Sequence, residues 1–150
     1  MEIIEYHEAD NREYWLGRIK ECDWRAGKYL YTLLSEDRLR KEYGESTRLF
    51  LLTDKTELVS FCTLAEKDEI PDTVLAPWVG FVYTFPQYRG KHYFGMLLDR
   101  ACRQAKNDGR DCVYISTEEI GLYEKYGCEH IADMTDRHGG RSRIYRKDIT

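Results

Sequence analysis

Residues 85–98, FPQYRGKHYFGMLL, join an apolar run to a helical pattern and include the basic residues Arg89 and Lys91. From Phe94 onward, apolar side chains recur every three or four residues, which is the pattern of an amphipathic helix. The stretch therefore contains a helix N-terminus, and Asn107-Asp108-Gly109 has the turn chemistry that ends a helix. The predicted buried positions are Phe94, Leu97, Leu98, Ala101, Cys102 and Ala105.

This helix N-terminus is predicted to bind an anion. The first N–H groups of a helix have no partner within it and carry partial positive charge. Arg89 and Lys91 add charge beside them, while Gly90 and Gly95 remove side chains that would clash with phosphate groups. The stretch therefore suits a pyrophosphate.

Two familiar nucleotide-binding loops do not match this stretch. Gly90 and Gly95 have the spacing of a P-loop, but Met96 stands where its lysine belongs and no Ser or Thr follows to hold magnesium. His92 occupies the place of the second glycine in the dinucleotide-binding fingerprint. A nucleoside triphosphatase and a dinucleotide-dependent enzyme are both disfavoured.

The elements around this helix indicate the fold class. Strand-like runs at residues 78–85 and 111–117 bracket it, so the three elements predict a βαβ unit with parallel strands. Two β-rich runs at 47–53 and 58–64, separated by polar residues, predict an antiparallel hairpin. The other predicted elements are a strand at 1–6, two helices within 13–39 broken near 23–27, a short helix at 120–126 and strands at 128–134 and 142–147.

Length and composition indicate a single domain, residues 1–150, of the α+β (mixed α/β) class. Of the 150 residues, 42% are hydrophobic, which is enough for one core. Lys and Arg number 23 against 27 Asp and Glu, and the net charge of −4 argues against nucleic-acid binding through phosphate neutralisation. We expect no nucleic-acid partner.

Membrane, export and metal signals are absent from the sequence. No apolar run approaches the roughly 20 residues of a membrane span, and the N-terminal MEIIEYHEAD is acidic, unlike a signal peptide. The five cysteines are dispersed without C-x-x-C spacing, and the histidines fall in no metal-binding pattern. We therefore expect a cytoplasmic protein with reduced thiols, no bound metal and no membrane partner.

Together these segments resemble the GNAT superfamily of N-acetyltransferases. Its signature Q/R-x-x-G-x-G/A is similar to the segment from Gln87 through Gly90 to His92, where His92 replaces the last Gly or Ala. Its later Tyr-x-x-x-Gly segment is similar to Tyr123 to Gly127, with Cys128 in place of the usual Phe. The resemblance covers nearly the whole chain and implies a mixed, mostly antiparallel central sheet of about seven strands flanked by about four helices.

The resemblance also implies which residues bind acetyl-CoA, the expected co-substrate. A bulged or splayed strand end would offer main-chain groups to the pantetheine arm and the thioester carbonyl. The following loop and the first helical turn would take the pyrophosphate. The cofactor-binding residues implied are Val82, Tyr83, Thr84, Gln87, Tyr88, Arg89, Gly90, Lys91, His92, Tyr93, Phe94 and Gly95.

The resemblance also implies catalytic residues, but it indicates a single residue only for the general acid and leaves several candidates for the general base. Tyr123 corresponds to the family's general acid, because a phenol can protonate a leaving thiolate. The alternative is that Tyr123 only packs a short helix, as we expect of Tyr126. The strand at 78–85 carries no carboxylate where some relatives place the general base. The candidates for the base are Glu66, Asp68 and Glu69, with Glu118 and Glu119 as competitors.

The sequence thus predicts an N-acetyltransferase that transfers acetyl from acetyl-CoA to a primary amine of a small cationic molecule, since acidic residues gather near the presumed acceptor side. The alternative is a non-catalytic acyl-CoA-binding or sensing module of the same fold. The absence of a carboxylate from the strand at 78–85 is the observation that favours this alternative. Trp15 and Trp24 fall in the region that lines the acceptor site in the family, although a Trp at helical spacing is more often part of a core. The sequence does not determine the oligomeric state, and a homodimer is one option.

Overall fold

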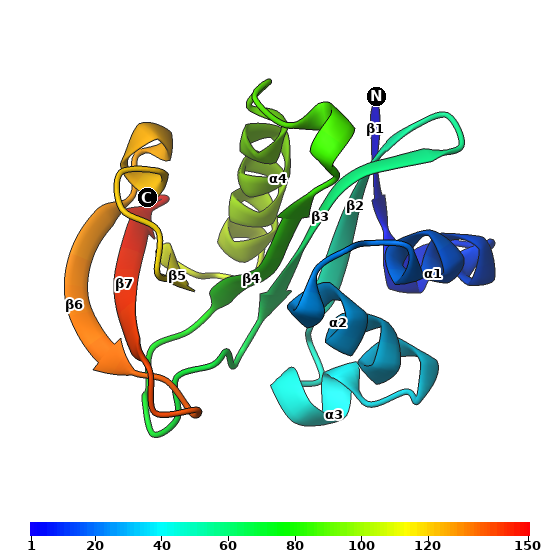
Figure 1. Cartoon of the computed structure of the whole chain (residues 1–150). Coiled ribbons are helices and arrows are strands. Elements are labelled where there is room, and N and C mark those ends of the chain that lie inside the picture. The colour runs from blue at the N-terminus through cyan, green and yellow to red at the C-terminus, as the bar shows by residue number, and fades with distance from the viewer.

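The computed structural model of residues 1–150 contains one seven-stranded sheet in the order β1-β2-β3-β4-β5-β7-β6, with helices on both faces (Figure 1). Its seven strands are β1 (Glu2–Glu5), β2 (Arg48–Asp54), β3 (Glu57–Ala65), β4 (Trp78–Thr84), β5 (Cys112–Thr117), β6 (Glu129–Thr135) and β7 (Arg141–Asp148). The helices are α1 (Arg12–Lys20), α2 (Arg25–Ser35), α3 (Leu39–Tyr43) and α4 (Tyr93–Asn107), and the single 3-10 turns are η1 (Tyr6–Glu8), η2 (Pro86–Tyr88) and η3 (Tyr123–Tyr126).

Alternating residues of β2 separate two hydrophobic cores. Phe50 and Leu52 belong to the cluster that contains the apolar side of α4. Leu49 and Leu51 belong to the cluster formed with α1, α2 and α3. Successive strand residues point to opposite faces, so a strand covered on both faces is apolar at nearly every position. All six positions of the predicted α4 stripe are buried in the first cluster, as the helical pattern predicts.

The predicted fold class is confirmed. The chain has four α-helices and a mixed sheet in which only the β4–β5 pair is parallel. β4, α4 and β5 form the predicted βαβ unit, and β2 and β3 form the predicted hairpin. No helix combines the length and the hydropathy that crossing a membrane requires.

Several predicted element boundaries differ from the structure, and three of the differences have a local cause. The helix predicted at 120–126 is only the 3-10 turn η3, because Gly121 takes a φ of +86° and cannot continue a helix. Asp37, with a φ of +55°, ends α2 and separates α3, which the continuous helical pattern did not resolve. The first strand ends at Glu5, whose carboxylate accepts a hydrogen bond from the Glu8 N–H at 3.0 Å and caps η1.

Candidate active site

β4 is paired along one edge and nearly free along the other. Toward β3 it runs antiparallel from Trp78 to Thr84, interrupted by a bulge at which Phe81 takes a φ of +47°. Toward β5 it pairs only where Trp78 meets Tyr114, and beyond that point the two strands diverge (Figure 1). The main-chain groups of Val82 to Thr84 that face β5 therefore have no strand partner and can receive an extended ligand.

The loop after β4 continues this open edge to the start of α4. The main-chain N–H groups of residues 90–94 have no main-chain acceptor. Gly90 and His92, with φ values of +82° and +59°, adopt the left-handed conformation that turns the chain into the helix. A Cβ on Gly90 would meet no atom within 4 Å, so this glycine is required by the backbone conformation. A row of free donors at a helix N-terminus is suited to an anion.

Polar and aromatic side chains flank these donors. Arg89 donates from Nε to the Thr84 carbonyl at 2.8 Å, and its guanidinium carbon lies 5.3 Å from the centre of the Tyr83 ring. Arg89 therefore braces the end of β4 while its terminal nitrogens remain beside the loop. Lys91 and Gln87 are exposed. The Tyr88 and Tyr93 rings pack edge-on with their centres 6.5 Å apart.

The first turn of α4 joins this loop to η3. Phe94 is buried, and its ring packs edge-on against the rings of Tyr123 at 5.9 Å and Tyr126 at 5.3 Å. A Cβ on Gly95 would approach the Tyr126 ring to 3.3 Å. Gly95 therefore allows close packing against Tyr126, a different role from the phosphate clearance that the sequence suggested. These contacts bring the two segments of the sequence signature together.

Tyr123 is 6% exposed, and its hydroxyl has no hydrogen-bond partner in the protein. Burial raises the pKa of this phenol well above its ordinary value, and the neighbouring Cys62 and Glu119 add to the shift. The hydroxyl is therefore held in its protonated form, as a hydrogen-bond donor to a leaving thiolate requires.

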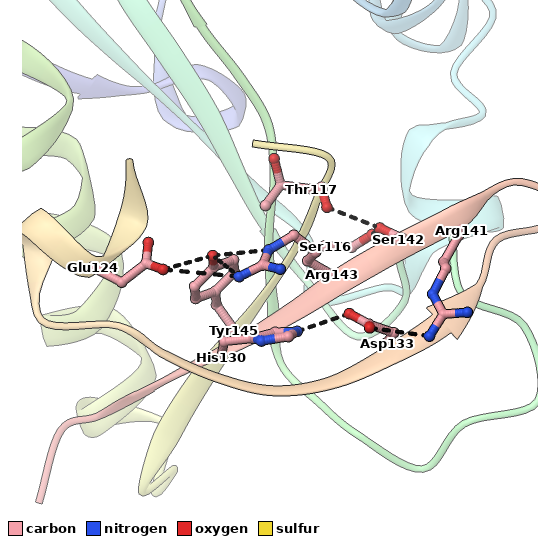
Figure 2. A network of polar contacts seen from close by, with 9 residues as sticks. All are labelled: Ser116, Thr117, Glu124, His130, Asp133, Arg141, Ser142, Arg143 and Tyr145. Atoms are coloured by element: carbon pink, nitrogen blue, oxygen red, sulfur yellow. Dashed lines mark hydrogen bonds and ion pairs between the residues drawn. The ribbon is translucent and has the colours of Figure 1, made fainter. Parts of the chain in front are cut away.

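A polar network on β7 fixes η3 in place (Figure 2). The Tyr145 hydroxyl donates to Glu124 at 2.9 Å and accepts from Nε and Nη2 of Arg143 at 3.1 and 3.0 Å. The Tyr145 ring also lies 5.9 Å from the Tyr123 ring. Lys147 donates to the carbonyl of the last η3 residue at 2.6 Å. Two attachments to one strand therefore position the phenol of Tyr123.

Two of the predicted bases are engaged in ion pairs. Glu66 accepts from Arg110 at 2.7 Å. Glu69 accepts from Arg137 through both carboxylate oxygens at 2.8 and 3.0 Å, and from the Tyr43 hydroxyl at 3.2 Å. These contacts tie the β3–β4 loop to the α4–β5 turn, α3 and the β6–β7 turn. The competitors Glu118 and Glu119 are exposed after β5.

Asp68 is the carboxylate that lies against β4. One of its oxygens occupies the space in which a side chain on Gly80 would begin, and the Thr63 hydroxyl borders the same space. Thr63 lies two residues from both Phe61 and Ala65 along β3, so the three side chains point to the same face of the sheet. Phe61 and Ala65 belong to the cluster under α1 to α3, and the notch is therefore on the face that these helices cover. Burial raises the pKa of Asp68 to about 7.

Aromatic side chains cover the same face of the sheet near the bulge. The Trp24 ring stacks on the Tyr83 ring at 5.4 Å with an interplanar angle of 9°. Phe61 and Phe85 pack around Tyr83 at 5.5 and 5.1 Å. Trp15 is 3% exposed and belongs to the core cluster, in agreement with the simpler of the two interpretations. Of these two tryptophans, Trp24 is the one whose ring stacks on a side chain of β4.

Sequence reasoning missed two features of the site: the notch at Gly80 that holds Asp68, and the polar network that supports η3. A glycine in the middle of a strand often marks a bulge or a close approach, so Gly80 carried a usable signal. The network of Glu124, Arg143 and Tyr145 carried none, because it depends on β7 lying between β5 and β6.

Comparison with known proteins identifies a family with these features. Residues 31–131 match the family model of the acetyltransferase (GNAT) domain. None of the curated proteins matches the chain.

Solved structures are similar to this chain over almost its whole length. The aminoglycoside 6′-N-acetyltransferase from Enterococcus faecium is 13% identical, with a TM-score of 0.72 and coverage of 100% of this chain and 98% of that one. An aminoglycoside 6′-N-acetyltransferase complexed with coenzyme A is 11% identical, with a TM-score of 0.69 and coverage of 100% and 98%. A GNAT acetyltransferase from Staphylococcus aureus Mu50 is 17% identical, with a TM-score of 0.66 and coverage of 99% of both chains. At these identities the likeness establishes the fold.

Proposed function

The chain belongs to the GNAT acetyltransferase family, and from this premise we propose that it transfers acetyl from acetyl-CoA to a primary amine of a small cationic molecule. The observation that carries the proposal is the open edge of β4, which leads directly into the free N–H donors of residues 90–94. An extended arm can bind the strand edge through main-chain hydrogen bonds, and a diphosphate can bind the donors at the helix N-terminus.

The residues at this edge fit coenzyme A. Val82, Tyr83 and Thr84 would offer main-chain groups to the pantetheine arm, and the bulge beside them would orient a donor toward the thioester carbonyl. Arg89 and Lys91 supply positive charge beside the donors of the loop. The coenzyme A complex of a structurally similar aminoglycoside acetyltransferase supports this assignment.

In this proposal Tyr123 acts as the general acid. Its packing on Phe94 keeps it beside the first turn of α4, and the tether through Glu124 keeps η3 on β7. A phenol held in its protonated form can donate to the sulfur as negative charge develops there. In this proposal Tyr126 has a packing role only.

The acceptor side is acidic and aromatic, which suits a cationic amine. Asp68 and Glu69 lie on the β3–β4 loop, and Trp24 and Tyr83 present stacked rings on the same face. Carboxylates attract a cation to a cleft, and aromatic rings can contact its apolar parts. Polyamines, aminoglycosides and lysine-like amines belong to this class, and the similar structures include aminoglycoside acetyltransferases.

The test is release of free thiol from acetyl-CoA with a panel of polyamines, aminoglycosides and lysine derivatives. We expect release that depends on the amine, together with an amine product that has gained one acetyl group. Matched N-acetylated amines serve as controls and should give no release. Tight coenzyme A binding by calorimetry without turnover on any amine would instead favour the non-catalytic acyl-CoA-binding module.

A further inference from the structure

The half-buried carboxylate in the Gly80 notch has no cationic partner. Glu66 and Glu69 on the same loop each form an ion pair with an arginine, whereas Asp68 takes part in no ion pair. A carboxylate removed from water without a paired cation costs stability unless it becomes protonated. Such a group next to the open edge of β4 is a candidate for function.

The notch lies next to the place where the thioester would bind. Gly80 precedes Phe81, the bulge residue, and Val82 to Thr84 form the free strand edge that follows. Gly80 is the residue of β4 whose missing side chain leaves room for a carboxylate from another element. The loop thus supplies to β4 the acidic group that the strand sequence lacks.

The charges around Asp68 are few. Glu69 from the same loop raises its proton affinity further, while Arg137 from the β6–β7 turn and the Glu69 main-chain N–H oppose the shift. β3 and β4 contribute the uncharged Thr63 and Gly80. A base is most effective when its pKa lies near the working pH, and burial brings this carboxyl to about 7.

We propose that Asp68, seated in the notch of Gly80, is the general base that removes a proton from the acceptor amine. This inference rests on the proposed function and adds the residue that function leaves unassigned. The Asp68 carboxylate accepts one proton from the ammonium and passes it to solvent. The nitrogen lone pair then forms the C–N bond to the thioester carbonyl carbon, and the C–S electron pair leaves with sulfur. Tyr123 donates a proton to that thiolate and is reprotonated by the second proton that the nitrogen loses.

The first experiment compares Asp68→Asn with wild type over pH 6 to 9, using an amine that the wild type acetylates. We expect kcat/KM at pH 7 to fall about 100-fold or more. Wild-type kcat/KM should rise and level off above about pH 7, whereas the variant should keep rising toward the pKa of the amine itself. Asp72→Asn removes the same charge from an exposed position of the same loop and should retain the wild-type rate and profile.

A second experiment tests whether the position of the carboxylate matters, by moving it from residue 68 to residue 80. Asp68→Ala is the reference variant. Adding Gly80→Asp to Asp68→Ala moves the carboxylate onto β4, into space that the first change empties, and should recover at least about tenfold of the lost kcat/KM. Thr63 must shift by a few tenths of an ångström to accept the new Cβ, which lies 3.3 Å from its hydroxyl.

A readout without turnover checks the burial of the carboxyl. The folded protein binds the Asp68 proton more tightly than the unfolded chain, so wild type loses stability as pH rises from about 4 to about 7. Asp68→Asn should therefore be more stable than wild type at pH 8 and no more stable at pH 3. A carboxyl carbon shift that titrates near the ordinary pKa of aspartate by NMR would overturn the proposal.

The outcomes separate the two proposals. If wild type acetylates an amine and Asp68→Asn stays within threefold of it with an unchanged pH profile, the base assignment fails and the proposed function stands. If wild type binds coenzyme A but acetylates no amine, the proposed function fails and the base assignment fails with it.

Discussion

The two edges of β4 have opposite properties although they belong to the same seven residues. The edge toward β3 is paired from Trp78 to Thr84, and side chains of the two paired strands, such as Phe61 and Tyr83, belong to one buried cluster. The edge toward β5 is paired at a single position and then opens. Pairing on one side holds the backbone rigid, and divergence on the other side leaves its hydrogen-bonding groups free for a ligand.

This difference separates stability from function within one strand. Changes that weaken the β3 edge should act mainly on unfolding, because they remove buried apolar contacts. Changes at the β5 edge and its loop should act mainly on binding and turnover, because β5 pairs with β4 at a single position and the N–H groups of residues 90–94 have no main-chain acceptor. The predictions below test this separation from the largest expected effect to the smallest.

Phe61→Ala should produce the largest effect, and it should be on stability. Phe61 is fully buried in β3 and packs on Tyr83 and Phe85. Deleting a buried phenylalanine ring typically costs about 3 to 5 kcal/mol of unfolding free energy. Urea denaturation measures the loss, and coenzyme A titration at low temperature, where the variant is folded, should show a much smaller change. A greater loss in affinity than in stability would contradict the division between the edges.

Tyr123→Phe should produce the next effect, on turnover alone. The ring and its packing on Phe94 remain, but the proton donor is gone, so kcat should fall by roughly 100-fold. Tyr126→Phe, on the same turn, is the matched control and should keep near-wild-type kcat. Coenzyme A affinity and the melting temperature should barely move in either variant.

The pH dependence of the wild type provides a second check on Tyr123. Because burial raises its pKa, the phenol stays protonated as pH rises, so the rate should not fall as pH approaches 10. The measurement needs conditions under which chemistry limits the rate, since slow product release would hide the step. A wild-type rate for Tyr123→Phe under those conditions would leave packing as its only role.

Gly90→Val should weaken coenzyme A binding by at least about tenfold, or 1.4 kcal/mol. Gly90 has a φ of +82° and open space around it, so valine would disturb the backbone conformation of the loop and not collide with a neighbour. Gly109, at the other end of α4, has a φ of +85° and equally open surroundings. Gly109→Val should therefore carry a similar strain while leaving affinity unchanged by calorimetry, and equal losses in both variants would contradict a phosphate site at the loop.

The same contrast explains which parts of the protein the sequence could predict. Local periodicity predicted α4 and the β2–β3 hairpin, because their apolar patterns reflect the faces that are covered. The meeting of Asp68 with Gly80, and the support of η3 by Tyr145, follow from strand order and from a bulge, which no local pattern contains. Contiguous motifs could indicate candidate residues such as Gly90 and Tyr123. The position of Asp68 against Gly80, which underlies the proposed choice among Glu66, Asp68 and Glu69, depends on the tertiary contact of the β3–β4 loop with β4.

His92→Gly should produce the smallest effect, a gain in stability of up to about 1 kcal/mol. His92 has a φ of +59°, where a side chain costs roughly 1 kcal/mol or more and glycine costs nothing. The gain is partly offset because glycine also gives the unfolded chain more freedom. His92→Ala is the control: it removes the imidazole but keeps a Cβ in the left-handed conformation, so urea denaturation should show no gain. If alanine stabilises as much as glycine, the imidazole itself and not the backbone is the source of strain at the start of α4.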